Sequence, residues 1–253
     1  MKKTIILSIL TVVAFASCDN PVSTPQTFSA SASSESTNKC EAVEEQATDG
    51  VPFEEISFSM EGDISHDKWN KNESASVTFD RIPTSVEEFK DLQQYLGKEP
   101  QGCVALQLMA MEMYRRDRVE GEECLKLNNT TTNLPSIVNR LKEVLCGTDS
   151  YARPHLVATY FEGATPQNGF NPDIPYKVNV RSSQTQDYQR SQMLQGYVLY
   201  LNVYSEGYDT KWRGIEVVKQ KGEEYYRVSN CPAIYVQCKE VDFDATHDYA
   251  GLR

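Results

Sequence analysis

The sequence has few histidines and none of the common catalytic motifs. It contains three histidines, so general acid–base chemistry has few candidates. The G-x-S-x-G elbow, the H-E-x-x-H zinc motif, the P-loop and the G-x-G-x-x-G loop are all missing. We therefore expect a non-catalytic protein rather than an enzyme, and we expect it to hold no cofactor. The alternative is a hydrolase whose site is assembled only in three dimensions.

Positive charge is scarce. The chain has 25 Lys and Arg residues against 36 Asp and Glu residues, which gives a formal net charge of −11. An acidic protein repels the phosphate backbone, so we expect no nucleic-acid partner. The same charge opposes adsorption to anionic lipid. Any attachment to a membrane would therefore need a separate anchor.

Long apolar runs are missing as well. The apolar segment 4–15 has about twelve residues, whereas a membrane-spanning helix needs roughly 20. Lys2 and Lys3 precede it, and small residues precede Cys18, which together are typical of a secretory signal. The block 15–18 (Phe-Ala-Ser-Cys) resembles a lipobox. The sequence thus predicts a lipid attached to Cys18, with ordinary secretion as the alternative.

These features predict the organisation of the whole chain. Residues 1–17 are a lipoprotein signal peptide, and residues 18–50 are a lipidated cysteine with a flexible linker poor in large apolar residues. A single α+β domain follows over residues 51–243, and residues 244–253 are a C-terminal tail. We expect an exported protein that touches the membrane only through its lipid anchor. The outer membrane of the cell envelope is favoured over the inner membrane.

The chain has seven cysteines and no C-x-x-C motif. Lipidation of Cys18 would leave six, and an even number in an exported protein permits disulfides. Cys103, Cys124 and Cys146 lie in apolar helical patterns, where a free thiol often packs as a small buried hydrophobe. We favour buried, reduced thiols, with a disulfide framework as the alternative. No cysteine–histidine spacing indicates zinc.

The periodicity of apolar residues predicts helices followed by strands. Alternation indicates short strands at 56–60 and 77–79, and a 3.6-residue period indicates helices at 86–96, 101–116 and 134–145. Further strands are expected at 155–161, 176–180, 197–204, 215–219, 224–228 and 233–238. The fold class is α+β. About three N-terminal helices are expected to pack on one face of a C-terminal antiparallel sheet that can be strongly curved.

The last third of the chain also resembles a known family. After the strand that begins at Tyr197, the loop residues Gly207, Asp209 and Arg213 and the strand residue Ile215 fit a pattern found in a bacterial domain-of-unknown-function family of lipoproteins. Upstream, Asn171-Pro172 resembles that family's entry to a strand, and Ile82-Pro83 the start of its first helix. The resemblance covers about residues 82–240 and implies a fold unit without an established activity.

Aromatic residues give the candidate ligand site. Eight lie between residues 197 and 235, and Tyr and Trp are frequent at recognition surfaces. We select Tyr208, Asp209, Trp212 and Arg213, in an expected loop, as a surface that could hold a glycan, a peptide or a partner protein. A scaffold without a ligand is the other non-catalytic alternative. For the hydrolase alternative, His155 is the one histidine at a suitable place.

Overall fold

The computed structural model describes residues 55–65, 73–148, 150–183, 188–241 and 251–252. Every described residue belongs to the compact unit Pro52–Arg253. The expected signal peptide, Cys18 and the linker therefore lie outside the described residues, as do residues 244–250 and 253 of the expected tail.

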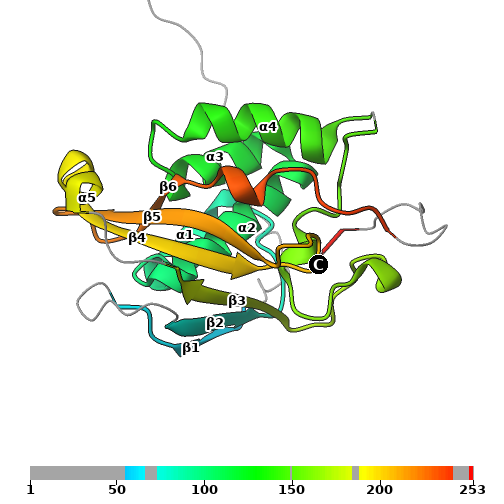
Figure 1. Ribbon diagram of the computed structural model, residues 1–253, viewed down its shortest axis with the longest axis horizontal. Coiled ribbons are helices and arrows are strands. Elements are labelled where there is room, and N and C mark those ends of the chain that lie inside the picture. Colours follow the sequence, from blue (N-terminus) through cyan, green and yellow to red (C-terminus); the bar gives the residue numbers. More distant parts are fainter. Residues whose placement is uncertain (1–54, 66–72, 149, 184–187, 242–250, 253) are drawn as a thin grey trace, which may run out of the picture. The chain divides into compact units, whose positions relative to one another are not determined.

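The described residues form a mixed α+β domain around one antiparallel sheet. Six strands occur in the order β1-β2-β3-β4-β5-β6, so each strand pairs with its neighbour along the chain. Figure 1 shows the sheet as an open, twisted layer that is not strongly curled, which decides against the strong curvature that the sequence left open. The strands are β1 Phe58–Gly62, β2 Ser74–Phe79, β3 Tyr176–Ser182, β4 Gly196–Tyr204, β5 Trp212–Gln220 and β6 Arg227–Asn230.

Five α-helices are found among the described residues, two more than the sequence predicted. The helices are α1 Val86–Leu96, α2 Pro100–Arg116, α3 Arg118–Asn128, α4 Leu134–Cys146 and α5 Tyr188–Leu194. The predicted helices correspond to α1, α2 and α4. Because β1 and β2 precede α1, and α5 lies between β3 and β4, the helices do not form one N-terminal block.

The sequence specifies the start of α1 through its cap. The Ser85 side chain accepts a hydrogen bond from the Glu88 N–H at 3.2 Å, and Glu88 in turn accepts one from the Thr84 N–H at 2.7 Å. The first bond satisfies a backbone donor that a helix start leaves unpaired, and the second holds the residue before the cap against the first turn. The helix ends at Leu96, with Gly97 as its C-cap, in agreement with the predicted range 86–96.

Helix α2 is the centre of the core. Its residues from Pro100 to Tyr114 are all buried, and apolar residues occupy most of its circumference, which is typical of a helix enclosed by other elements. It contacts β2, β3, β5 and β6 as well as α1, α3 and α4. Two glycines allow neighbouring backbones to approach. A Cβ on Gly102 would lie 2.0 Å from the Leu96 carbonyl oxygen, and one on Gly121 would lie 2.1 Å from the Tyr114 Cα.

Two predicted strands are wrong. Residues 155–161 form turns and the 3-10 helix Ala158–Tyr160, with one isolated bridge from Phe161 to Val178. Every residue from Leu156 to Phe161 is buried, and a continuous apolar run does not distinguish a strand from a buried turn. Residues 233–238 are likewise not a strand, because Pro232 starts the 3-10 helix Pro232–Ile234. A third such helix is Pro166–Asn168.

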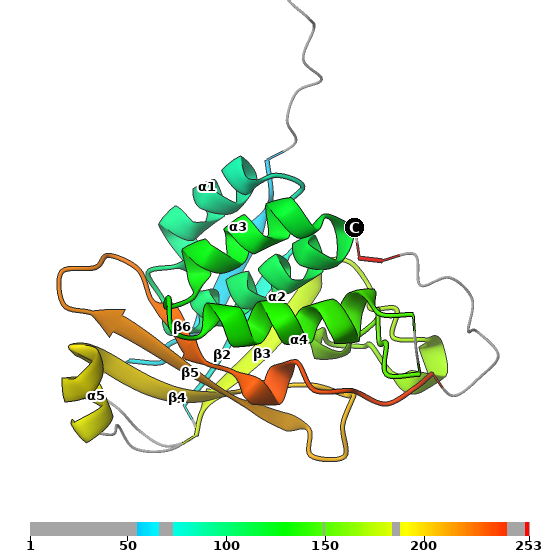
Figure 2. The ribbon, with the colours of Figure 1, turned by 90° about the horizontal axis from the view of Figure 1, so that it is seen from above.

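Figure 2 shows α5 at one end of β4 and β5, apart from the other four helices. This short helix contacts only part of the sheet. In the parts of the chain that the structure describes, no helix has the length and apolar character needed to cross a membrane.

Candidate functional site

The two faces of the sheet differ in composition. In β3, the side chains of Tyr176, Val178 and Val180 are buried, and the residues between them are half-buried and polar. The buried set belongs to the main core with α2. The polar set forms what we call the open face of the sheet. Its paired residues are Ser76 with Asn179, Thr78 with Lys177, Arg181 with Asn202, Tyr200 with Glu216, and Tyr204 with Trp212.

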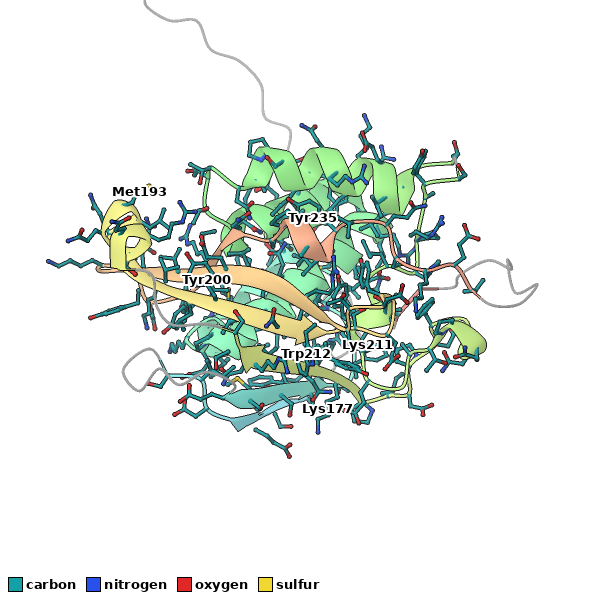
Figure 3. All side chains as sticks on the ribbon, viewed as in Figure 1. Lys177, Met193, Tyr200, Lys211, Trp212 and Tyr235 are labelled. Atoms are coloured by element: carbon teal, nitrogen blue, oxygen red, sulfur yellow. The ribbon has the colours of Figure 1, made fainter. Side chains whose placement is uncertain are left out.

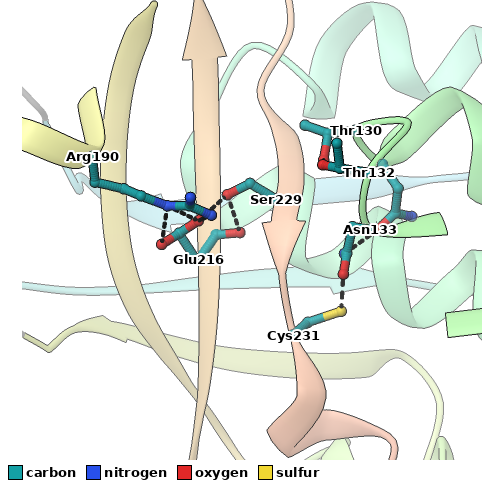
Figure 4. Close-up of polar contacts among 8 residues, drawn as sticks. Thr130, Thr132, Asn133, Arg190, Glu216, Ser229 and Cys231 are labelled. Carbon is teal, nitrogen blue, oxygen red and sulfur yellow. Dashed lines mark hydrogen bonds and ion pairs between the residues drawn. The ribbon is translucent and has the colours of Figure 1, made fainter. Parts of the chain in front are cut away.

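Helix α5 covers one end of the open face. Val198 and Val218 pair directly across β4 and β5 and are fully buried, yet they lie outside the main core cluster. Beside them, Arg190 of α5 donates to the buried Glu216 carboxylate at 2.9 Å, and Ser229 Oγ donates to the same carboxylate at 2.6 Å (Figure 4). This end of the open face is therefore closed by a short helix and an internal ion pair.

The other end of the open face is hollowed and carries an aromatic pair. The Trp212 ring meets the Tyr204 ring edge-on at 5.2 Å between centroids, and the Arg181 guanidinium lies 4.1 Å from the Trp212 ring centroid. All three side chains are half-buried. In Figure 3, Trp212 lies with Lys211 toward the end of the sheet opposite Met193 of α5.

A polar depression of about 720 Å³ surrounds this pair, and we call it the hollow. Residues from five strands, from the segment 162–165 and from the loop after β4 line it. Its polar and aromatic lining residues are Glu61, Ser74, Ser76, Glu162, Thr165, Asn179, Tyr204, Glu206 and Trp212.

Two of the carboxylates that line the hollow, Glu162 and Glu206, accept hydrogen bonds from neighbouring side chains. Asn179 donates to Glu162 at 3.0 Å. The Tyr204 hydroxyl donates to Glu206, which also forms an ion pair with Lys211. These hydrogen bonds from Lys211 and Tyr204 lower the pKa of Glu206. The carboxylate is thus ionised at neutral pH, so it suits acceptance of hydrogen bonds rather than general-acid catalysis.

The structure separates the four residues predicted as the ligand site. Trp212 lies in strand β5 and not in a loop, and it faces the hollow. Tyr208 is buried, and its hydroxyl donates to the Val236 carbonyl oxygen at 2.7 Å. The Arg213 guanidinium stacks on Tyr208 at 4.1 Å and its Nε donates to the Ala233 carbonyl oxygen. Tyr208 and Arg213 therefore hold the segment after β6 against the sheet.

Asp209 does not lie beside the aromatic residues of the predicted site. Its side chain is 95% exposed and pairs with Lys239 at 2.7 Å. Hydrogen bonding to Lys239 lowers the pKa of Asp209. Because this pair is exposed, it contributes little to stability, and no aromatic contact of Asp209 is seen among the described residues.

His155 is placed as a structural residue. Its ring stacks on Phe170 at 5.0 Å between centroids, and its Nε2 lies 3.0 Å from the Lys239 carbonyl oxygen. Burial lowers the pKa of His155, which favours the neutral imidazole. Its neighbours thus hold the ring in place.

The described cysteines are free thiols, and four of these five are buried. The buried thiols are Cys103, Cys124, Cys231 and Cys238. Burial raises the pKa of Cys231 to about 12, and its sulfur lies 3.7 Å from the Asn133 amide (Figure 4). A buried thiol of this kind is unreactive at neutral pH. No group of three or more potential metal ligands occurs in the described segments.

Sequence reasoning found Trp212 and missed the residues that accompany it. Arg181 and Tyr204 stand on the polar side of strands β3 and β4. The alternation Tyr176, Val178, Val180 against the residues between them was a signal that Arg181 lies on the outer side of its strand. Its contact with Trp212 depends on the pairing of β3 with β4 and of β4 with β5.

The family described as Domain of unknown function (DUF6935) matches residues 81–242. This match begins just before α1 and ends after the segment that follows β6, so it covers most of the described domain. No curated protein and no solved structure matches the chain.

Proposed function

The chain belongs to the DUF6935 family, a domain of unknown function, and from this premise we propose that its domain is a non-catalytic module that binds a glycan in the hollow of the open face. The observation that carries the proposal is the half-buried Trp212, which lines the hollow with Tyr204 and contacts the Arg181 guanidinium. Tyr and Trp combine an apolar ring with a polar tip and are enriched where one molecule recognises another.

The chemistry around the rings supports a sugar in particular. A sugar has apolar C–H faces for an aromatic ring and hydroxyl groups that both donate and accept hydrogen bonds. The hollow offers acceptors in the carboxylates of Glu162 and Glu206 and a donor in the Asn179 amide, and Lys211 lies beside Glu206. Because the charged lining residues, Glu61, Glu162 and Glu206, are all acidic, a neutral glycan fits better than a polyanion.

The hydrolase alternative receives no support from these contacts. His155 is held against Phe170 and a backbone carbonyl oxygen. Glu206 is held ionised by Lys211 and Tyr204, whereas a glycosidase acid must carry a proton. Binding without catalysis is therefore the function that the hollow supports best.

Tryptophan fluorescence gives a direct test. The chain has two tryptophans, Trp69, which lies outside the described residues, and Trp212. In a Trp69→Phe background the emission reports on Trp212 alone. We expect cell-wall fragments or neutral oligosaccharides to change this emission with saturation. In a thermal-shift screen, a ligand at 100 times its Kd adds about 2.7 kcal/mol, which raises Tm by about 5–11 °C for a domain of this size.

Two variants then locate the site. Trp212→Ala should weaken binding by at least about tenfold, equivalent to about 1.4 kcal/mol. Tyr197→Ala is the matched control, because Tyr197 is an exposed aromatic residue of β4 outside the hollow. A glycan that binds Trp212→Ala as tightly as the parent protein would refute the hollow as its site. A flat glycan panel would favour a peptide or protein ligand, or the scaffold alternative.

We further propose that the protein is exported and anchored to the outer membrane through a lipid on Cys18. The support is the sequence alone, namely the two lysines, the short apolar segment 4–15 and the Phe-Ala-Ser-Cys block 15–18. The Cys18→Ser variant should move from the membrane fraction to the soluble fraction, and metabolic labelling with a fatty-acid analogue should disappear. Equal labelling of both proteins would contradict the anchor.

A further inference from the structure

The first strand of the sheet leaves a backbone edge open. In the antiparallel pairing of β1 with β2, the Asp80 N–H donates to the Ser57 carbonyl oxygen at 3.2 Å. Bonds to a partner strand alternate along such a ladder. The backbone groups of Ser57, Ser59 and Glu61 therefore face β2, and those of Phe58 and Met60 point outward. Within the described ranges, no backbone group bonds to this outer edge.

The opposite edge of the sheet is occupied. Asn129 forms a parallel bridge with Val228 of β6, and the Thr130 N–H donates to the Val228 carbonyl oxygen at 2.9 Å. The segment after α3 thus covers the backbone of β6. Among the described residues, the outer edge of β1 is therefore the sheet edge that has no backbone partner, and a further strand could be added there.

A groove of about 490 Å³ lies between β1 and α1, beside the open edge. Its apolar lining residues are Ile56, Phe58, Leu92 and Tyr95. The rings of Phe58 and Tyr95 lie 5.9 Å apart, and Tyr95 is 61% exposed. A strand added to β1 would lie about 4.8 Å from it, and every second side chain would point to the α1 side and into this groove.

The groove is acidic. Four carboxylates line it, and none of its lining residues is basic. The four are Glu55, Glu87, Glu88 and Asp91. Arg81 neutralises Glu88, and Lys90 lies 3.8 Å from Glu87. Glu55 and Asp91 have no ion pair of this kind among the described residues, so the charge favours a positively charged occupant.

We propose that the β1 edge and the groove beside α1 bind an extended basic segment of a partner protein as an added strand. Backbone hydrogen bonds to Phe58 and Met60 supply affinity, and alternate side chains select the sequence, as in other cases of strand addition. Among the side chains that point to the α1 side, apolar ones contact Tyr95 and Leu92, and lysine or arginine lies near Glu55 and Asp91. This site is separate from the glycan hollow and does not depend on it.

Synthetic nine-residue peptides and the full chain test the proposal by fluorescence anisotropy. A peptide with valine and lysine in turn at every second position, the positions that face the groove, and threonine between them should bind, and the same peptide with glutamate in place of lysine should bind at least about tenfold more weakly. A third peptide, methylated at the backbone nitrogens that face β1, should also lose at least about tenfold, because it cannot donate to the edge. Equal binding of the parent and methylated peptides would overturn strand addition.

Variants of the protein place the peptide. Met60→Pro removes an outward N–H without removing a bond to β2, and proline is tolerated at such edge positions. We expect it to abolish binding, whereas Met60→Ala retains it. Tyr95→Ala should weaken binding, with Tyr151→Ala, another exposed tyrosine, as the control. Unchanged binding by both Met60→Pro and Tyr95→Ala would refute the site, and so would peptide-independent dimerisation through this edge in sedimentation.

Discussion

Glu88 forms an ion pair with Arg81 and also accepts a hydrogen bond at the start of helix α1. Its carboxylate accepts from Arg81 Nη2 at 2.6 Å and from the Thr84 N–H at 2.7 Å, and its side chain is only 11% exposed. Burial alone would raise the pKa of Glu88, but the hydrogen bonds from Arg81 and Thr84 outweigh it and lower the pKa from 4.5 to about 2.

This shift predicts an acid-sensitive contribution to stability. Because the pKa in the folded state lies below the unfolded value, the stabilisation is fully present above about pH 4.5 and is lost as the pH falls toward 2. The contribution amounts to about 2–3 kcal/mol. Glu88→Gln should lower the free energy of unfolding in urea at pH 7 by about that amount. The difference should shrink by more than half by pH 3.

Glu87→Gln is the control for this effect. Glu87 is the next residue in the same helix turn, but its side chain is 78% exposed and lies 3.8 Å from Lys90. Exposed pairs contribute about 0–1 kcal/mol, so this variant should unfold like the parent protein at both pH values. A Glu88→Gln penalty that is the same at pH 7 and pH 3 would contradict the assignment.

At the residue scale, the sequence indicated which residue types carry recognition but not which of them share a surface. Trp212 was predicted and lies in the hollow. Tyr208 and Arg213 stand close to it in the chain, yet they pack together elsewhere. Successive side chains of a strand alternate between faces, so neighbours such as Trp212 and Arg213 separate once the segment is a strand and not a loop.

At the scale of elements, helices α2 and α3 are in close backbone contact. A Cβ on Gly121 of α3 would lie 2.1 Å from both the Cα and the N of Tyr114 in α2. Real Cβ atoms do not approach a backbone this closely, so α3 would have to shift. Alanine would raise the helix propensity of the isolated segment by about 1 kcal/mol. The contact thus opposes the local preference.

We therefore predict that Gly121→Ala destabilises the protein by about 2–3 kcal/mol in urea-induced unfolding. Gly214→Ala is the control, because its Cβ would meet only the Asn202 Oδ1 atom at 3.9 Å, which is an ordinary contact. It should change the free energy of unfolding by less than about 0.5 kcal/mol. If Gly121→Ala were neutral or stabilising, the close approach of α2 and α3 would be wrong.

The elements that the sequence predicted correctly are those with strong local signals. The cap at Ser85, the apolar α2 and the alternation in β4 are readable without tertiary information. Helix α3 was missed because its segment is rich in charge and has few buried positions. Helix α5 was missed because tertiary contacts, such as the pair of Arg190 with Glu216, support it. Tertiary packing thus decided what local propensity left open.

At the scale of the whole molecule, the candidate site and the open edge depend on strand order. The hollow needs β1 to β5 side by side, and the groove needs β1 at the margin of the sheet with α1 beside it. Neither arrangement can be predicted from the spacing of residues along the chain. Segments as distant as Glu61 and Trp212 line one hollow only because five strands pair in sequence order.

The part of the chain that contributes residues to the core can also be tested. Its residues come from Ile56 to Leu252, and Leu252 is tied to α2, since its N–H lies 3.4 Å from the Glu112 carboxylate and its carbonyl oxygen accepts from Arg116. The unit Pro52–Arg253 therefore contains every residue of the described core. We predict that deleting residues 1–51 leaves one cooperative unfolding transition and changes Tm by less than about 1 °C.

Leu252→Ala in the same shortened protein shows that the measurement can detect a loss. It removes a side chain that is only 7% exposed and should cost about 2–3 kcal/mol, or roughly 4–12 °C in Tm. Differential scanning calorimetry of the three proteins decides between the two possibilities. If the deletion lowered Tm as much as Leu252→Ala does, residues 1–51 would have to contribute to the fold. The hollow and the β1 groove would then have to be reconsidered together with them.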